Sequence, residues 1–179
     1  MKQAITETIT LPQGVQAEYV DGILTVKAKN ELKRNLFRPK IAVSVDAENI
    51  TLHVDSSTQR EKKQLYTMKA HILNMIRGSQ EAHTYKVKVC SGHFPMNVSI
   101  SNGVLTVKNF LGEAVPRKLV LKKDVSVVLN GDIIEISSPY IERAGTQASD
   151  IEQLTKITNR DRRIFQDGLY IIEKDGNAI

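Results

Sequence analysis

The side chains of this chain that could do chemistry are mainly basic, and they gather in three short segments. A guanidinium group presents a planar fork of N–H donors that matches the oxygens of a phosphate, and an ammonium group attracts the same charge. Such clusters on a fixed scaffold suit the backbone of a folded RNA. The first cluster holds Lys33, Arg34, Arg38 and Lys40, the second holds Arg117, Lys118, Lys122 and Lys123, and the third holds Arg160, Arg162 and Arg163.

The two clusters of the second half also have simpler interpretations. Lysines on an edge strand keep it from pairing with another chain, and the segment 117–123 is expected to be a strand or loop at a sheet edge. The arginines near residue 160 could occupy a solvated turn, with Phe165 and Tyr170 packed in the core. The aromatic content of 5% offers no stacking platform for a single strand of nucleic acid.

Residue types that serve catalysis are present, but their spacing is not catalytic. Cys90 is the single cysteine, and it ends an alternating segment where a small apolar side chain is expected. His53, His71, His83 and His93 lack the spacing of metal ligands. The glycines form neither a dinucleotide-binding pattern nor a phosphate-binding loop. We therefore predict that the chain is not an enzyme and has no metal, no cofactor and no small-molecule substrate.

Length and composition indicate a globular protein. The 179 residues allow one large domain or two small ones, and 41% of them are hydrophobic. The formal net charge of +5 is a modest bias toward polyanionic partners. No apolar stretch has the length of a signal peptide or of a bilayer-spanning helix. The expected location is the cytoplasm, with no membrane partner.

One short phrase occurs twice and predicts two hairpins. DGILTVK at residues 21–27 returns as NGVLTVK at residues 102–108. Asp-Gly and Asn-Gly between alternating segments are typical of two-residue type I′ turns, in which both central residues have positive φ. Pairing outward from each turn places apolar side chains on one face: Val15, Ala17, Tyr19, Leu24 and Val26 in the first copy, and Val98, Ile100, Leu105 and Val107 in the second.

The similarity of the two halves continues beyond these hairpins. Segments 41–54 and 124–137 each predict a second hairpin, the later one around an Asn130-Gly131 turn. Each is followed by a helical pattern opened by Thr-Gln. The first pattern runs to Gly78, a plausible residue just past the helix end, and the second covers 146–158 with a possible start at Ala144. The same order of two hairpins and a helix is thus predicted in both halves of the chain.

The fold class predicted is α+β, with two homologous tandem modules. Each module is a small, mostly antiparallel β structure packed on one α-helix, because a sheet with one apolar face needs a cover. The first module is expected to span residues 1–80 and the second residues 81–179. Their junction is expected in the short polar segment GSQEAH, residues 78–83.

Four segments together resemble a known family. They are the doubled G-[IV]-L-T-V-K hairpin, HILNMIRG, YKVKVCSGHFPMNV and RDRRIFQDGLYIIEK. In order and spacing the whole chain is similar to the large ribosomal subunit protein six family, in its archaeal and eukaryotic branch. The resemblance implies a structural, non-catalytic constituent of the large subunit that binds rRNA. It also implies a place near the sarcin–ricin loop and the factor-binding side, with neighbouring ribosomal proteins as partners and translational GTPases in proximity.

The same resemblance implies that the second module carries the main RNA-binding surface. Two segments depart from the family pattern, namely Gly92 within SGHFP and the junction GSQEAH. The competing hypothesis is a non-ribosomal protein-interaction module whose basic residues only protect edge strands. The residues implied to contact RNA are Ser91, His93, Met96, Lys108, Arg117, Lys118, Lys122, Lys123, Arg160, Arg162 and Arg163.

Overall fold

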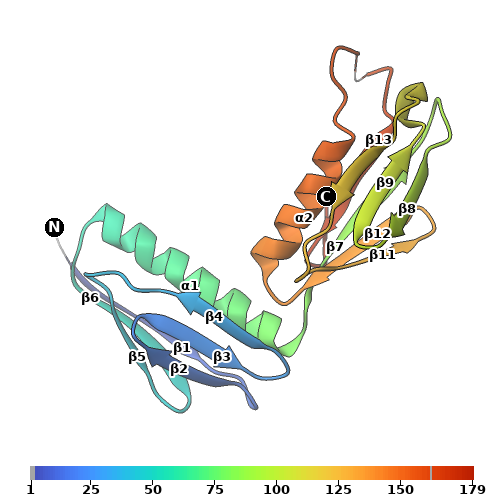
Figure 1. Cartoon of the computed structure of the whole chain (residues 1–179). Helices are drawn as coiled ribbons and strands as arrows, with labels where there is room; N and C mark the ends of the chain where they lie inside the picture. The colour runs from blue at the N-terminus through green and yellow to red at the C-terminus, as the bar shows by residue number, and fades with distance from the viewer. Residues whose placement is uncertain (1–2, 162) are drawn as a thin grey trace. The chain divides into compact units, whose positions relative to one another are not determined.

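The structure is a computed structural model that describes residues 3–161 and 163–179 (Figure 1). The chain divides between Ala82 and His83 into two compact units. This division falls two residues after the boundary expected from the sequence.

The first unit consists of two antiparallel three-stranded sheets and one helix. The sheet orders are β1-β6-β5 and β2-β3-β4, and α1 packs against strands of both sheets. The elements are β1 (Gln3–Thr10), β2 (Gln16–Val20), β3 (Ile23–Lys27), β4 (Glu31–Asn35), β5 (Ala42–Val45), β6 (Asn49–Ser57) and α1 (Gln59–Gln80).

The second unit also contains two antiparallel sheets and one long helix. The sheet orders are β11-β12-β7-β13-β14 and β10-β9-β8, and α2 packs against β7, β12, β13 and β10. The elements are β7 (His83–Cys90), β8 (Asn97–Ser101), β9 (Val104–Lys108), a 3₁₀ turn (Phe110–Gly112), β10 (Arg117–Val120), β11 (Ser126–Asn130), β12 (Ile133–Ser138), α2 (Ile141–Leu154), β13 (Gly168–Lys174) and β14 (Asn177–Ala178).

The two units share one topology, which confirms the predicted tandem modules. Adding six to each strand number of the first unit converts β1-β6-β5 into β7-β12-β11 and β2-β3-β4 into β8-β9-β10. In both units the helix follows directly after the second hairpin. The second unit differs by the strands β13 and β14, which extend its larger sheet beyond β7.

The repeated phrase forms the hairpin turns that its residues predict. Asp21 and Gly22 have φ values of 50° and 79°, and Asn102 and Gly103 have 50° and 72°. Positive φ at both central residues is the type I′ geometry, whose twist matches that of the flanking strands. The leucine two residues after each turn glycine is fully buried, with Leu24 and Leu105 both at 0% exposure.

The later hairpin of the second unit is shifted by one residue from the prediction. Asn130 pairs with Ile133, so the two turn residues are Gly131 and Asp132 rather than Asn130 and Gly131. Gly131 alone has positive φ there, at 60°. A glycine at the first central position with positive φ is the type II′ arrangement.

Helix α1 begins as the sequence predicts. Thr58 is the N-cap, and a capping box joins its side chain and backbone to Glu61. Lys40 donates to the other oxygen of Glu61 at 3.0 Å. The hydrogen bond from the Thr58 side chain and the one from Lys40 lower the pKa of Glu61 to about 2.

The predicted end of α1 is wrong. Gly78 lies inside the helix and is buried, and the helix continues to Gln80. The reason is a partner distant in sequence, because Asn30 donates from its side chain to the carbonyl of Gly78 at 3.2 Å and from its backbone to the carbonyl of Ser79 at 3.0 Å. These bonds satisfy carbonyls that a local glycine turn would otherwise cap.

The predicted start of α2 is also wrong. The helix begins at Ile141, so Thr146 and Gln147 lie within it. Thr146 donates to the carbonyl of Glu142 at 2.6 Å, and the Gln147 side chain is fully buried and accepts the backbone N–H of Lys122 at 3.0 Å.

The outer edge of β13 is covered by side chains rather than by a full strand. Thr155 accepts the backbone N–H of Leu169 at 2.8 Å, and Glu152 accepts that of Ile171 at 3.1 Å. Both acceptors lie at the C-terminal end of α2 or just after it, beside β13 in Figure 1. Strand β14 pairs only with the last two residues of β13.

Candidate nucleic-acid interface

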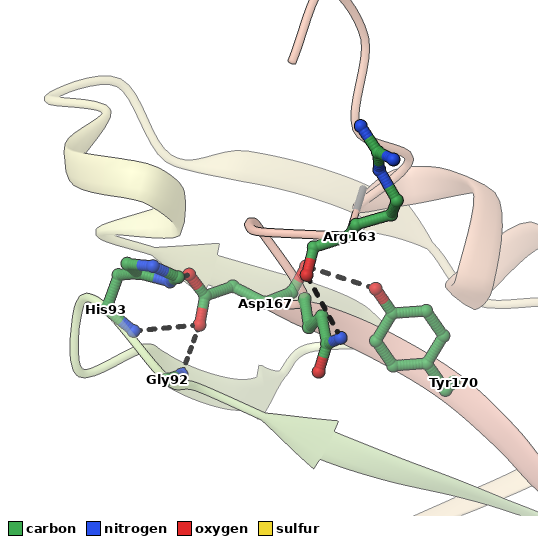
Figure 2. Close-up of polar contacts among 6 residues, drawn as sticks. Gly92, His93, Arg163, Asp167 and Tyr170 are labelled. Carbon is green, nitrogen blue, oxygen red and sulfur yellow. Dashed lines mark hydrogen bonds and ion pairs between the residues drawn. The ribbon is translucent and has the colours of Figure 1, made fainter. Parts of the chain in front are cut away.

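A buried carboxylate joins two loops at one end of the second unit. Asp167, which precedes β13, is 1% exposed. It accepts hydrogen bonds from the backbone N–H groups of Gly92 and His93, the latter at 3.0 Å, and its second oxygen lies 2.9 Å from Nδ1 of His93 (Figure 2). We call this arrangement the Asp167 clamp. It fixes the loop after β7 against the segment that connects α2 to β13.

The ionisation of Asp167 is set by two opposing effects. Burial raises its pKa, but the hydrogen bonds from Gly92 and His93 favour the carboxylate, and together they leave the pKa below its ordinary value. Asp167 therefore stays charged at neutral pH. Since a carboxylate repels phosphate, its role is to position the loops and not to contact a nucleic acid.

Two of the residues that the resemblance implies contact RNA pack against the ring of Phe165. The rings of His93 and Phe165 lie with centroids 5.0 Å apart, and the guanidinium carbon of Arg160 lies 4.9 Å from the Phe165 centroid. Cation–π contact of this kind contributes about 0.5–1 kcal/mol at an exposed site. The sequence alternative placed Phe165 in the core, and in the structure it is half-buried and packs against the core beneath these two residues.

Arg163 is strongly exposed at this end of the second unit. Its side chain is 89% exposed and pairs with Asp161, with Nη2 2.7 Å from Oδ2. The Arg163 side chain, followed by its backbone N–H, lowers the pKa of Asp161. Exposed pairs of this kind are weak, so the guanidinium is available to a stronger anion. Arg162 lies outside the described residues.

Arg117 is half-buried, and contacts within the protein hold its guanidinium. Nε and Nη2 donate to the Glu113 carboxylate at 2.9 and 2.6 Å. Nη1 donates to the carbonyl of Leu154 at 2.8 Å, and the guanidinium lies 4.3 Å from the centroid of Phe110. These contacts join the start of β10 to the segment 110–113 and to the end of α2, which is the role of a positioning residue.

The remaining residues divide between this end and the opposite one. Ser91 is exposed in the loop of the clamp, Lys108 is exposed at the end of β9, and Met96 is half-buried against the core. Lys118, Lys122 and Lys123 are exposed on or beyond β10. Leu121, next to Lys122, donates its backbone N–H to the carbonyl of Gly103 at 2.8 Å, at the turn between β8 and β9. The loop of the clamp enters β8 at the other end of this hairpin. The structure thus separates the two lysines after β10 from the clamp.

Lys122 also has a partner on α2. Its ammonium lies 3.1 Å from Asp150, with both side chains near 40% exposed. Lys118 lies on β10, which is at the edge of its sheet, as the sequence predicts.

Comparison with known proteins identifies the family. Large ribosomal subunit protein uL6 of Methanosphaera stadtmanae is 41% identical over 173 residues, covering 95% of this chain and 94% of the relative. The protein of the same name from Natronomonas pharaonis is 37% identical over 166 residues, covering 92% and 94%. The chain belongs to the uL6 family. The uL6 protein of Methanococcus vannielii adds 36% identity over 176 residues, covering 98% and 97%.

Membership of the uL6 family confirms the resemblance read from the sequence, and the uL6 relatives are archaeal ribosomal proteins rather than enzymes. No family model matches the chain. Among the described residues, no group of three or more His, Cys, Asp or Glu side chains is placed to hold a metal ion. No helix in the described part of the chain is long and apolar enough to cross a membrane.

The residue of the uL6 site that sequence reasoning missed is Asp167. Asp167-Gly168 resembles the Asp-Gly of a hairpin turn, yet the aspartate is buried and its partner Gly92 lies 75 residues earlier. A local pattern carries no information on such a partner. Asp161, Glu173 and Asp175 are acidic residues of the same C-terminal segment, so nothing in the sequence singles out Asp167.

Proposed function

We propose that this uL6 family member is a structural constituent of the large ribosomal subunit, and that one end of its second unit binds the rRNA backbone. The observation that carries the proposal is the Asp167 clamp. It fixes His93, whose ring packs on Phe165, and the guanidinium of Arg160 lies over the same Phe165 ring. The exposed Arg163 follows Arg160 by three residues. The family name of the relatives, large ribosomal subunit protein, supplies the class of ligand.

The proposed mode of binding reads the shape of folded RNA. Phosphate contacts from rigidly held cations fix register and orientation without reading base sequence. Lys108 and Lys118 are exposed and extend the surface, and the half-buried Arg117 and Met96 support it. Lys122 and Lys123 lie at the opposite end of the unit and would make a separate contact. If about four to six phosphates are neutralised, the slope of log K against log[salt] is roughly −3 to −5.

The proposed location is near the sarcin–ricin loop on the factor-binding side of the subunit. This part of the proposal rests on the family resemblance, as does the proximity of translational GTPases and of neighbouring ribosomal proteins. Crosslinking the protein in intact ribosomes and mapping the attached nucleotides tests it. Attachment to rRNA far from that loop contradicts the location and leaves the RNA-binding proposal in place.

The direct test replaces Arg160, Arg162 and Arg163 with alanine in the full chain. Filter binding to deproteinised large-subunit rRNA is measured over a range of salt concentrations. Each lost phosphate contact reduces the magnitude of the salt slope by about 1, so we expect a reduction of about 2 to 3 together with weaker binding. The control replaces Arg143 and Lys174, which are exposed near the start of α2 and at the end of β13 farthest from Asp167.

An affinity and slope equal to those of the control variant contradict the assignment of this surface. The competing function, a non-ribosomal protein-interaction module, is separated by sedimentation of the native protein in a high-salt gradient. A constituent of the subunit sediments with it. Sedimentation in a smaller assembly without rRNA favours the competing function.

A further inference from the structure

We propose that the first unit carries its own phosphate-binding pocket, formed by β4, the segment after it and α1, and that this pocket takes a phosphodiester group of an RNA backbone. The inference rests on the proposed function for the kind of ligand, since both name RNA. It concerns a different unit and different residues.

The pocket has a volume of about 240 Å³ and is lined on several sides by basic groups. Lys63, Thr67 and His71 line it from α1. They are spaced four residues apart, which puts them on one face of the helix. Arg34 from β4 and Arg38 from the following segment complete the wall. No carboxylate is among the residues that line it.

Contacts within the protein hold these groups in place. Nη2 of Arg34 lies 3.2 Å from Nε2 of His71, and because a guanidinium only donates, the imidazole nitrogen accepts. Nη1 of Arg38 donates to the carbonyl of Phe37 at 2.7 Å. Lys63 is exposed on α1. Three side chains that are cationic at neutral pH therefore face a common space, from which a bound anion would receive several charge-assisted hydrogen bonds.

The nearest acidic side chains are engaged elsewhere. Glu61 is 5% exposed and is occupied by Thr58 and Lys40. Glu31, on the same strand as Arg34, lies 2.9 Å from the Lys33 ammonium. Neither of these carboxylates lines the pocket.

The size of the pocket favours one group of a polymer over a free cofactor. Sites for whole small molecules enclose about 300–1,000 Å³, which is more than this pocket offers. A phosphodiester presents two charged oxygens on a narrow link between bulky sugars, so a small cationic pocket accepts it edge-on. Among polymers with phosphodiester groups, we choose folded RNA because the relatives are ribosomal proteins.

The test compares two neighbouring lysines on α1. Lys63 lines the pocket and Lys62 does not, yet both are exposed on the same helix. Filter binding of full-length Lys63→Gln and Lys62→Gln to deproteinised large-subunit rRNA is measured across salt concentrations. We expect Lys63→Gln to reduce the magnitude of the salt slope by about 1 and Lys62→Gln to leave it unchanged. The advantage of the wild type over Lys63→Gln then shrinks about fourfold between about 50 and 200 mM salt.

A second variant and a second ligand test the same pocket independently. Arg38→Gln, checked by thermal unfolding for an intact fold, should repeat the effect of Lys63→Gln. Inorganic phosphate should shift the NMR signals of the His71 ring in the wild type and not in Lys63→Gln. If phosphate shifts those signals but Lys63→Gln binds RNA as Lys62→Gln does, the pocket takes a free phosphate and the RNA inference is overturned.

The outcomes also separate this inference from the proposed function. If the wild type binds rRNA and the arginine variant of the second unit binds weakly, while Lys63→Gln and Lys62→Gln behave alike, only the pocket inference fails. If the wild type does not bind rRNA at all, the proposed function fails first. A loss seen with Lys63→Gln alone supports the pocket and moves the main RNA contact to the first unit.

Discussion

Replacing Asp167 with alanine removes the acceptor on which the Asp167 clamp depends. The carboxylate accepts two backbone N–H groups, from Gly92 and His93, and bonds to the His93 ring. A hydrogen bond to a charged group contributes about 1.5–3 kcal/mol to stability. Gly92 and His93 are exposed, so water replaces part of what is lost. We expect Asp167→Ala to lower the free energy of unfolding of the second unit by about 2–4 kcal/mol.

Asp167→Asn is the graded comparison. Its amide oxygen can still accept both backbone N–H groups, but the bonds are those of a neutral acceptor. Since neutral bonds contribute about 0.5–1.5 kcal/mol each, we expect a smaller loss of about 1–2 kcal/mol. We therefore expect Asp167→Ala to lose more stability than Asp167→Asn.

Hydrogen exchange measured by mass spectrometry under native conditions is the suitable assay. Two units need not unfold together, so a single denaturation curve does not define one free energy. Peptides from α1 serve as the internal control, and peptides that contain Gly92 and His93 should exchange faster in both variants. If the second-unit peptides of Asp167→Ala keep their opening free energy to within about 0.5 kcal/mol, the reasoning about the Asp167 clamp is refuted.

The pH dependence of the same assay follows from the lowered pKa of Asp167. A depressed carboxyl pKa in the folded protein contributes stability that is fully present above the unfolded value of about 3.9 and is lost as the pH falls through the folded pKa. The wild-type second unit should therefore lose its advantage over Asp167→Ala on acidification below that value. An advantage that stays constant to acid pH contradicts the role of the charge.

Two further predictions concern the folding of each unit. The pKa of Glu61 is about 2, so its contribution to the stability of the first unit is fully present above about pH 4.5 and disappears as the pH falls toward 2. Thr58→Ala should reduce this acid dependence and cost about 1 kcal/mol of stability at neutral pH. Acid titration monitored by α1 exchange checks both effects, and an unchanged acid profile in Thr58→Ala contradicts them. In the second unit, Leu105 is fully buried, so Leu105→Ala should cost about 2–5 kcal/mol in calorimetry, whereas a loss below about 1 kcal/mol would mean that the site collapses around the cavity.

The fold was predictable wherever the controlling interactions are local. The turns at Asp21-Gly22 and Asn102-Gly103 depend on their own residues, and so does the capping box at Thr58. Gly78 misled the prediction of the α1 end because Asn30, a residue of another hairpin, caps the last carbonyls. The start of α2 was missed because Gln147 is fixed by a backbone group of the loop between β10 and β11 and not by its neighbours in sequence.

The candidate site was predictable in composition and not in arrangement. Basic side chains are visible in any sequence, so Arg160 and Arg163 could be named as candidates. Which of the cations are free to meet a ligand depends on contacts between segments distant in sequence, and such contacts hold Arg117 on Glu113 and on the carbonyl of Leu154. Asp167 was missed for the same reason, since the bond that explains it closes a loop of 75 residues.

The outer edge of β13 has a consequence for the protein before it joins its assembly. An open strand edge is a template on which a second copy can add a strand, the first step toward aggregation. The side chains of Thr155 and Glu152 occupy the N–H groups of Leu169 and Ile171 that such a copy would need. In a newly made copy that is not yet assembled, these side chains at the end of α2 therefore protect this edge of β13 from pairing with another copy.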